Sequence, residues 1–308
     1  MTAPDDGRRR RLRRLADTRG IVAGIALDHR DSLRATLERR GVGGLTTDDL
    51  RDLKTGLVRA LAPASTALML DAELGGRALE SGAVPPWVGL IMPLEAQGYE
   101  AAGDDRTTSL MPDFPPLEAM RYGADAAKLL VPYRVDRAQA AAQDATVAAA
   151  ATACHELGLP LVIEPLVYRV SAETAEAYAA AYPGLVVRAV ARLVPLGADL
   201  LKLPFPVVDL AAAGEATAAA ACARLHDACA GTPWVLLGAG VATDVFLDQI
   251  RLAGRAGASG FLAGRGIWGP ALSADAEATG RLAATSSLVD LERCRDVAAR
   301  FARPLPSP

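Results

Sequence analysis

Eight short aliphatic runs alternate along the chain with longer stretches in which polar residues recur at helical spacing. The runs occupy 21–28, 66–71, 87–92, 126–131, 160–165, 198–203, 234–240 and 260–265. Most of them are continuously apolar, which is typical of parallel strands covered on both faces. Strand and helix patterns that alternate eight times predict an α/β fold, a single (β/α)8 TIM barrel over residues 1–308. A doubly wound open sheet is the alternative, but its first strand would lead into G-x-G-x-x-G, and "ALDHRDSL" does not match.

Helix boundaries are set by residues that favour helix starts and ends. Thr47 is the expected N-cap of a helix that stops at Pro63, and Thr243 that of a helix ending at Gly257. The stretch 171–197 is expected to hold a helix, a break at Pro183–Gly184 and a second helix. A short basic lead-in covers 1–19, with its arginines expected in water, and a C-terminal helix covers about 274–302.

The polar stretch 95–118 interrupts this rhythm after the third predicted strand. It contains glycine and proline and is of loop length, so we expect it to cover the mouth of the barrel.

The composition excludes several classes of partner. A net charge of −3 leaves no electrostatic footprint for nucleic acid or an acidic membrane surface. The N-terminus lacks the apolar core of a signal peptide, and no apolar run approaches the roughly 20 residues of a membrane span. The four cysteines form no C-x-x-C pair, which favours small packing residues in a reducing compartment. We therefore expect a cytoplasmic protein without nucleic-acid or membrane partners.

Polar residues gather where the predicted strands end, which in such barrels is where chemistry takes place. In strand order they are Asp28, His29 and Arg30; Asp71; Lys128; Glu164; Lys202; Gly238, Ala239 and Gly240; and Gly264 and Arg265.

Lys128, Glu164 and Lys202 lie inside apolar runs on three successive strands. Imine formation is a chemistry that needs two lysines and a glutamate in a dry pocket. A nucleophilic lysine must be a neutral amine, and burial and a second cation nearby both lower a lysine pKa. Lys202 is the expected nucleophile, Lys128 the neighbouring cation and Glu164 the proton shuttle. A buried structural ion pair is the alternative for any one of the three residues.

The glycine-rich ends of the seventh and eighth strands suit a phosphate. Backbone N–H groups near helix N-termini form an anion cradle, and Arg265 adds a guanidinium that can bind in a bidentate manner. His29 could touch the substrate or make a structural hydrogen bond. The three histidines are scattered along the chain, so we expect neither a metal site nor a cofactor.

With these motifs in place, the chain resembles the class I aldolases of the tagatose-1,6-bisphosphate aldolase family and the related sulfofructosephosphate aldolases. The matching stretches are "ALDHRDSLRATL", "AAKLLV", "IEPLVY", "GADLLKLPFP", "PWVLLGAGV" and "AGASGFLAGRGIW". The resemblance implies a metal-independent lyase with Lys202 as Schiff-base lysine, Glu164 as acid/base, Lys128 as second lysine and Asp28 as catalytic aspartate. It also implies a phosphate on Arg265, cleavage of a ketose phosphate to dihydroxyacetone phosphate and an aldehyde, and a homo-oligomer, either dimer or tetramer.

The chain departs from the family pattern at three places. His29 stands where the family has glutamine, Lys202-Leu203-Pro204 stands where it has K-V-E, and Gly238 stands where it has serine. A transaldolase or biosynthetic aldolase using the same imine is one alternative function. A barrel that senses a sugar phosphate without catalysis is another.

Overall fold

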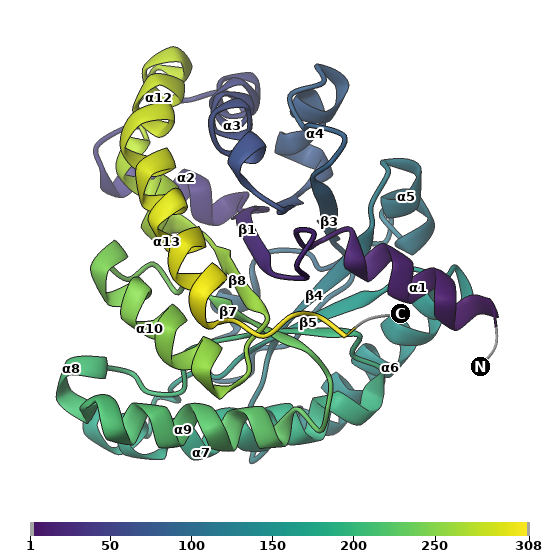
Figure 1. The fold of residues 1–308 in the computed structure, drawn as a ribbon, viewed down its shortest axis with the longest axis vertical. Helices are drawn as coiled ribbons and strands as arrows, with labels where there is room; N and C mark the ends of the chain where they lie inside the picture. Colours follow the sequence, from purple (N-terminus) through teal and green to yellow (C-terminus); the bar gives the residue numbers. More distant parts are fainter. Residues whose placement is uncertain (1–2, 307–308) are drawn as a thin grey trace.

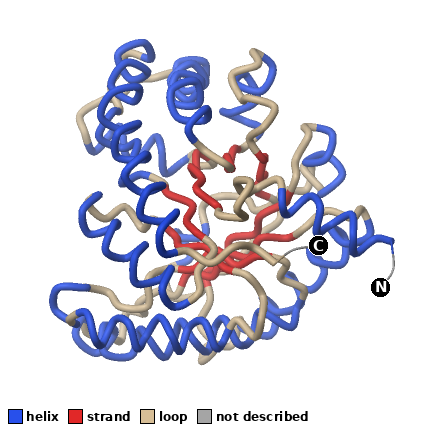
Figure 2. The backbone as a smooth tube through the Cα atoms, viewed as in Figure 1, coloured by secondary structure: helices blue, strands red, loops and turns tan. Residues whose placement is uncertain are grey.

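All eight expected strands form, and they pair in chain order into a closed parallel barrel. The computed structural model describes residues 3–306. The strands are β1 (Val22–Leu27), β2 (Ala67–Leu70), β3 (Gly89–Pro93), β4 (Ala126–Pro132), β5 (Leu161–Leu166), β6 (Leu200–Leu203), β7 (Trp234–Leu237) and β8 (Gly260–Ala263). The predicted TIM barrel is confirmed, and the strands gather at the centre of the molecule with helices around them (Figure 2).

Helices follow every strand and cover the outside of the barrel (Figure 1). They are α1 (Ala3–Arg13), α2 (Asp31–Arg39), α3 (Thr47–Leu61), α4 (Ala72–Glu80), α5 (Pro116–Arg121), α6 (Ala140–Glu156), α7 (Ala175–Leu193), α8 (Leu210–Ala213), α9 (Glu215–Ala228), α10 (Thr243–Ala256), α11 (Arg265–Trp268), α12 (Ala276–Leu282) and α13 (Leu288–Phe301). Short 3-10 turns are η1 (Ala62–Ala64), η2 (Tyr99–Ala102), η3 (Val194–Leu196) and η4 (Gly269–Ala271), and the π-helical turn η5 (Ala283–Ser287) joins α12 to α13.

Alternate residues of each strand face opposite sides, which divides the apolar side chains into two cores. The larger core lies between the barrel and its helices. The smaller core fills the barrel interior, and it includes Val22, Ala26, Ala67, Met69, Ile91, Ala126, Val162, Leu200, Val235 and Leu262. Space in the interior is tight: a Cβ on Gly24 would lie 2.4 Å from Leu262 Cδ2. The interior core therefore gives the site a solid floor.

The N-terminal lead-in closes the bottom of the barrel. Leu15 is fully buried in the interior core, and its carbonyl accepts a hydrogen bond from Thr66 Oγ1 at 2.8 Å. Arg14 Nε donates to Asp125 Oδ1 at 2.6 Å. A Cβ on Gly89 would lie 2.5 Å from the carbonyl oxygen of Arg14. Arg14 stays half exposed, as expected for this basic lead-in, and its contact with Asp125 also anchors the segment.

Three predicted helix boundaries need correction. Helix α7 is continuous and contains Pro183, because one missing N–H costs a single hydrogen bond while the following turns pack on the barrel. Thr46, not Thr47, caps α3, where it exchanges hydrogen bonds with Asp49 in a capping box. Thr243 is the first residue inside α10, and its hydroxyl donates to Asp290 Oδ2 at 2.9 Å. The predicted end at Gly257 is confirmed, with φ at +119°.

One segment is longer and more apolar than the sequence pattern suggested. Residues 175–196, which form α7 and η3, have the length and composition of a membrane span, with a mean hydropathy of 1.3. In the fold this segment is an outer helix of the barrel, and it buries Leu185, Val186, Ala189, Val190 and Leu193.

Candidate active site

The period of two along the strands places the polar side chains above the interior core. Lys128, Glu164 and Lys202 each follow an interior apolar residue of the same strand by two positions, and Asp28 follows Ala26 in the same way. All four therefore point into the barrel at its C-terminal mouth. They line a cavity of about 460 Å³.

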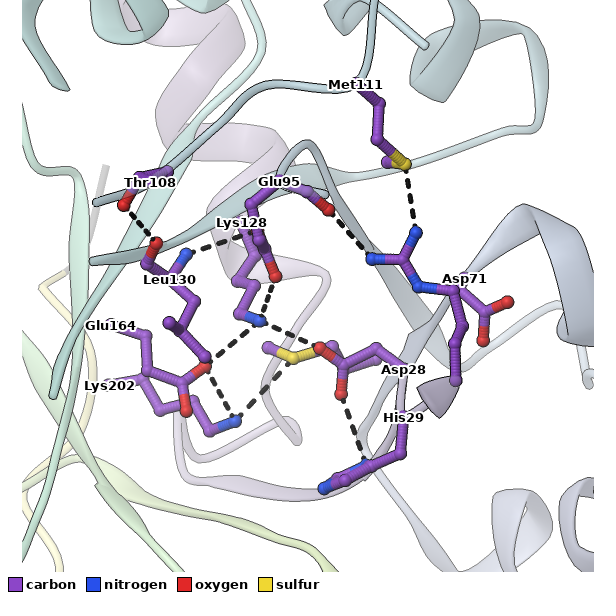
Figure 3. Close-up of polar contacts among 12 residues, drawn as sticks. Asp28, His29, Asp71, Glu95, Thr108, Met111, Lys128, Leu130, Glu164 and Lys202 are labelled. Carbon is purple, nitrogen blue, oxygen red and sulfur yellow. Dashed lines mark hydrogen bonds and ion pairs between the residues drawn. The ribbon is translucent and has the colours of Figure 1, made fainter. Parts of the chain in front are cut away.

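Lys202 and Glu164 form a buried polar pair in the wall of this cavity. Lys202 Nζ donates to Glu164 Oε2 at 3.0 Å and lies 3.7 Å from the sulfur of Met69 (Figure 3). The side chains of Lys202 and Glu164 are 3 % and 5 % exposed. An amine and a carboxyl group in contact within a nearly dry pocket can exchange a proton directly.

Lys128 is the centre of the ion-pair cluster (Figure 3). Its Nζ lies 2.5 Å from Glu95 Oε1, 2.9 Å from Asp28 Oδ2 and 3.4 Å from Glu164 Oε2. Burial acts to lower the pKa of Lys128, but the three carboxylates outweigh it and hold the pKa well above its usual value. Lys128 is therefore a permanent cation beside the Lys202–Glu164 pair.

Asp28 stays ionised in the same cluster. Burial acts to raise its pKa, but the charges of Lys128, Lys202 and His29 lower it below the usual range. Its carboxylate accepts a hydrogen bond from Lys128 on one oxygen, while the other faces His29 Nδ1 at 3.7 Å. An ionised carboxylate at this place can hold a substrate hydroxyl.

His29 is a neutral imidazole at the side of the cavity. Burial, together with the charges of Arg265, Lys202 and Lys54, lowers the pKa of His29 to about 3, against the opposite effect of Asp28. The ring stands edge-on to Trp268, with the two ring centroids 5.2 Å apart. Among residues 3–306, His29 Nδ1 is buried without a hydrogen-bond partner and faces Asp28, while the residue itself lines the cavity.

The predicted anion cradle lies on the same cavity. Ala239, Gly240, Gly264 and Arg265 all line it, while Gly238 stands just outside its lining. Ala239 and Gly240 have positive φ angles of 41° and 77°. The cradle is thus on the β7 and β8 side of the mouth, next to His29.

Two predicted ligand contacts, Asp71 and Arg30, are engaged elsewhere in this structure and are not part of the cavity lining. Asp71 caps α4 by accepting a hydrogen bond from the N–H of Leu74 at 2.7 Å, and it pairs with Lys54. Arg30 donates to the backbone oxygen of Glu95 at 2.8 Å.

Two members of the cluster were missed by the sequence analysis. Glu95 comes after β3 in the polar loop, and its one available signal was its spacing: it follows Ile91 and Pro93 with the same period of two. Lys54 lies on helix α3, where its position on the buried face was the signal. Its Nζ contacts Asp71 and donates to the carbonyl of His29 at 2.8 Å.

The whole chain contains only three lysines, Lys54, Lys128 and Lys202, among its 33 basic residues. They are 1 %, 2 % and 3 % exposed. Every lysine is therefore buried in or directly behind the site, and the surface cations of the described chain are arginines.

The four cysteines are free and buried in the helical layer. Burial raises the pKa of the Cys222 thiol to about 12, which makes it unreactive. Within residues 3–306 no group of three or more His, Cys, Asp or Glu side chains is arranged to hold a metal ion.

Comparison with known proteins gives consistent results over most of the chain. A family model described as "DeoC/LacD family aldolase" matches residues 22–269. A tagatose 1,6-diphosphate aldolase of Listeria monocytogenes (serotype 4a, strain HCC23) is 29 % identical over 273 residues, covering 83 % of this chain and 80 % of that protein. Tagatose 1,6-diphosphate aldolase 1 of Enterococcus faecalis is 27 % identical over 283 residues, covering 87 % and 86 % of the two chains.

Solved structures share the fold at lower identity. A Schiff-base-forming fructose-1,6-bisphosphate aldolase has a TM-score of 0.64 and 18 % identity, covering 96 % of this chain and 99 % of that one. The fructose-bisphosphate aldolase of Slackia heliotrinireducens also has a TM-score of 0.64, with 20 % identity and coverage of 100 % and 94 %.

Proposed function

Because the chain belongs to the DeoC/LacD family of aldolases, we propose that it is a class I aldolase acting through an imine on Lys202. The substrate is a ketose bisphosphate or a related ketose phosphate, and the products are dihydroxyacetone phosphate and an aldehyde. The observation that carries this proposal is the 3.0 Å contact between Lys202 Nζ and Glu164 Oε2 in the cavity wall, beside the cation Lys128. The curated relatives named for tagatose 1,6-diphosphate support this substrate class.

The reaction begins with transfer of a proton from Lys202 to Glu164, which leaves the neutral amine that a nucleophile requires. The amine attacks the ketone carbon and forms a carbinolamine. Glu164 then returns its proton to the carbinolamine hydroxyl, which leaves as water and gives the iminium ion. Lys128 keeps its proton throughout, because Asp28 and Glu95 hold it as a cation.

Cleavage follows from the iminium ion. Glu164, now ionised, accepts the proton of the hydroxyl on the far carbon of the bond that breaks, which is the β carbon counted from the iminium ion. The electron pair of the carbon–carbon bond moves into the iminium ion and gives an enamine, while the far fragment leaves as an aldehyde. Protonation of the enamine and hydrolysis by water then release dihydroxyacetone phosphate and restore Lys202.

The rest of the cavity orients the substrate in this proposal. Asp28 and His29 hold hydroxyl groups, and the cradle of Arg265, Gly240 and the neighbouring backbone holds a phosphate. The ligand roles that the sequence suggested for Asp71 and Arg30 are not part of it, since both side chains are engaged behind the site.

Borohydride reduction with a ketose phosphate tests the proposal directly. The expected product is a mass adduct on the peptide containing Lys202, and with only three lysines in the chain the assignment is unambiguous. Lys202→Met should lose both the adduct and turnover, while the exposed variant Arg121→Met serves as the matched control. No adduct across a panel of ketose phosphates, with native protein confirmed by circular dichroism, would refute an imine mechanism.

We further propose that the protein works as a soluble cytoplasmic dimer or tetramer. Exposed apolar side chains such as Trp87 and Val289, 66 % and 55 % exposed, support association between copies. Light scattering coupled to size exclusion gives the mass, and a monomer at micromolar concentration would contradict this.

A further inference from the structure

Two lysines compete for one oxygen atom in this site. Glu164 Oε2 lies 3.0 Å from Lys202 Nζ and 3.4 Å from Lys128 Nζ. The proposed chemistry needs this oxygen for Lys202, because Glu164 must take up and return the proton of the reacting nitrogen. A second ammonium drawn fully onto the same oxygen would lower the basicity of Glu164 and occupy the position through which the proton moves.

Glu95 holds Lys128 away from that contact. Its Oε1 lies 2.5 Å from Lys128 Nζ, the shortest of the three ion pairs that Lys128 makes with Glu95, Asp28 and Glu164. Its Oε2 accepts a hydrogen bond from the backbone N–H of Leu130 at 3.2 Å. Both carboxylate oxygens are therefore engaged, and the side chain is 7 % exposed.

The backbone around Glu95 is fixed as firmly as its side chain. Glu95 pairs with Leu110 in an antiparallel bridge, and the N–H of Ala96 donates to the carbonyl of Ser109 at 2.7 Å. Arg30 donates to the carbonyl of Glu95 at 2.8 Å. The polar loop after β3 thus places a carboxylate over Lys128, and Figure 3 shows Glu95 reaching Lys128 on the side away from Lys202.

We propose that Glu95 is a positioning residue. From the loop after β3 it binds Lys128 of β4, and so keeps Glu164 Oε2 for Lys202. This inference rests on the proposed imine chemistry and extends it to a residue that the sequence motifs do not include. Without the charge of Glu95, Lys128 keeps Asp28 and Glu164 as its partners and moves toward Glu164. The proton transfer between Glu164 and Lys202 then slows, while substrate binding is little changed.

Glu95→Gln is the decisive variant, because the amide keeps the size and the acceptor for Leu130 but removes the charge. We expect kcat to fall about 10- to 100-fold, as part of a general acid–base contribution is lost, with KM within about threefold. Glu118→Gln is the matched control and should behave as the wild type, because Glu118 is a partly exposed glutamate on α5 that pairs with Arg121.

The pH profile separates this role from a merely structural one. Burial raises the pKa of Glu95, the charge of Lys128 lowers it, and the negative charge of Asp28 raises it again. The resulting pKa lies above the usual value. The charged groups around it are Lys128, Asp28 and, through Lys128, Glu164, while Arg30 binds its backbone. As pH falls, wild-type Glu95 loses its charge earlier than an ordinary glutamate, so the acid limb of kcat should lie at lower pH in Glu95→Gln.

Three results decide the matter. A lower kcat with unchanged thermal midpoint and a shifted acid limb supports the inference, while unchanged kcat and acid limb overturn it. If Glu95→Gln does not fold, Glu95→Asp decides instead: the shorter side chain withdraws the carboxylate from its contact with Lys128, so kcat should fall while KM changes little. A wild-type kcat in that folded variant would overturn the inference. Wild-type borohydride trapping on Lys202 is run in parallel, and its absence would instead count against the proposed function.

Discussion

Mild acid should destabilise this protein through one buried imidazole, that of His29. The folded state holds the ring against Trp268 and near Arg265, Lys202 and Lys54, where burial and these cations lower its pKa from 6.5 to about 3. In the unfolded chain the pKa returns to about 6.5. Between these two values the unfolded state binds more protons than the folded state, so stability falls as pH falls through this range.

The size of the effect follows from the two pKa values. Between pH 7 and pH 5 the unfolded imidazole becomes almost fully charged while the folded one stays neutral, which lowers the free energy of unfolding by about 2 kcal/mol. Below pH 3 the loss is complete, because both states are then protonated.

Urea unfolding at pH 7 and pH 5 measures this loss, with His29→Gln as the variant that cannot be protonated. Contributions of the other titrating groups are largely common to both proteins and cancel in the double difference. The wild type should lose about 2 kcal/mol more than the variant over this pH interval. Equal losses, within about 0.5 kcal/mol, would show that His29 is not held neutral and that the electrostatic picture of the cavity wall is mistaken.

Further predictions concern the support behind the site, the barrel floor and the anion cradle. Lys54→Met should lower the free energy of unfolding by about 3–5 kcal/mol, since it leaves Asp71 buried without its cation; urea denaturation measures this, and a cost near zero would contradict the buried pair. Leu15→Ala should cost about 2–5 kcal/mol in the same assay, and a surface-like value under about 0.5 kcal/mol would mean that the lead-in does not close the barrel. Arg265→Ala should raise KM for a phosphorylated ketose by about tenfold or more in steady-state kinetics; an equal rise for the unphosphorylated ketose would exclude a phosphate contact.

The barrel could be predicted from the sequence because its strands are buried on both faces. Each of the eight apolar runs overlaps one observed strand, and the errors are confined to the ends, as at 234–240, where β7 stops at Leu237. Local capping signals were less decisive. Thr46 and Thr47 are equivalent as isolated residues, and the capping box with Asp49 selects the first. Pro183 breaks a helix in isolation but not one whose later turns are packed.

The catalytic cluster was partly predictable for a similar reason. Lys128, Glu164 and Lys202 interrupt apolar strands, so that their burial could be inferred from their neighbours. Glu95 lies in a polar loop and Lys54 on an amphipathic helix, where a charged residue is ordinary. Only the closed barrel brings these two against Lys128 and Asp71, and no local pattern contains that information.

The burial of all three lysines should change how the folded protein reacts with reagents that modify amines. Acylating labels, amine cross-linkers and sugars that glycate proteins find no ε-amino group on its described surface. Random amine coupling to a resin would be inefficient, and slow browning in concentrated reducing sugar should be reduced, while sugar admitted to the cavity still meets an amine.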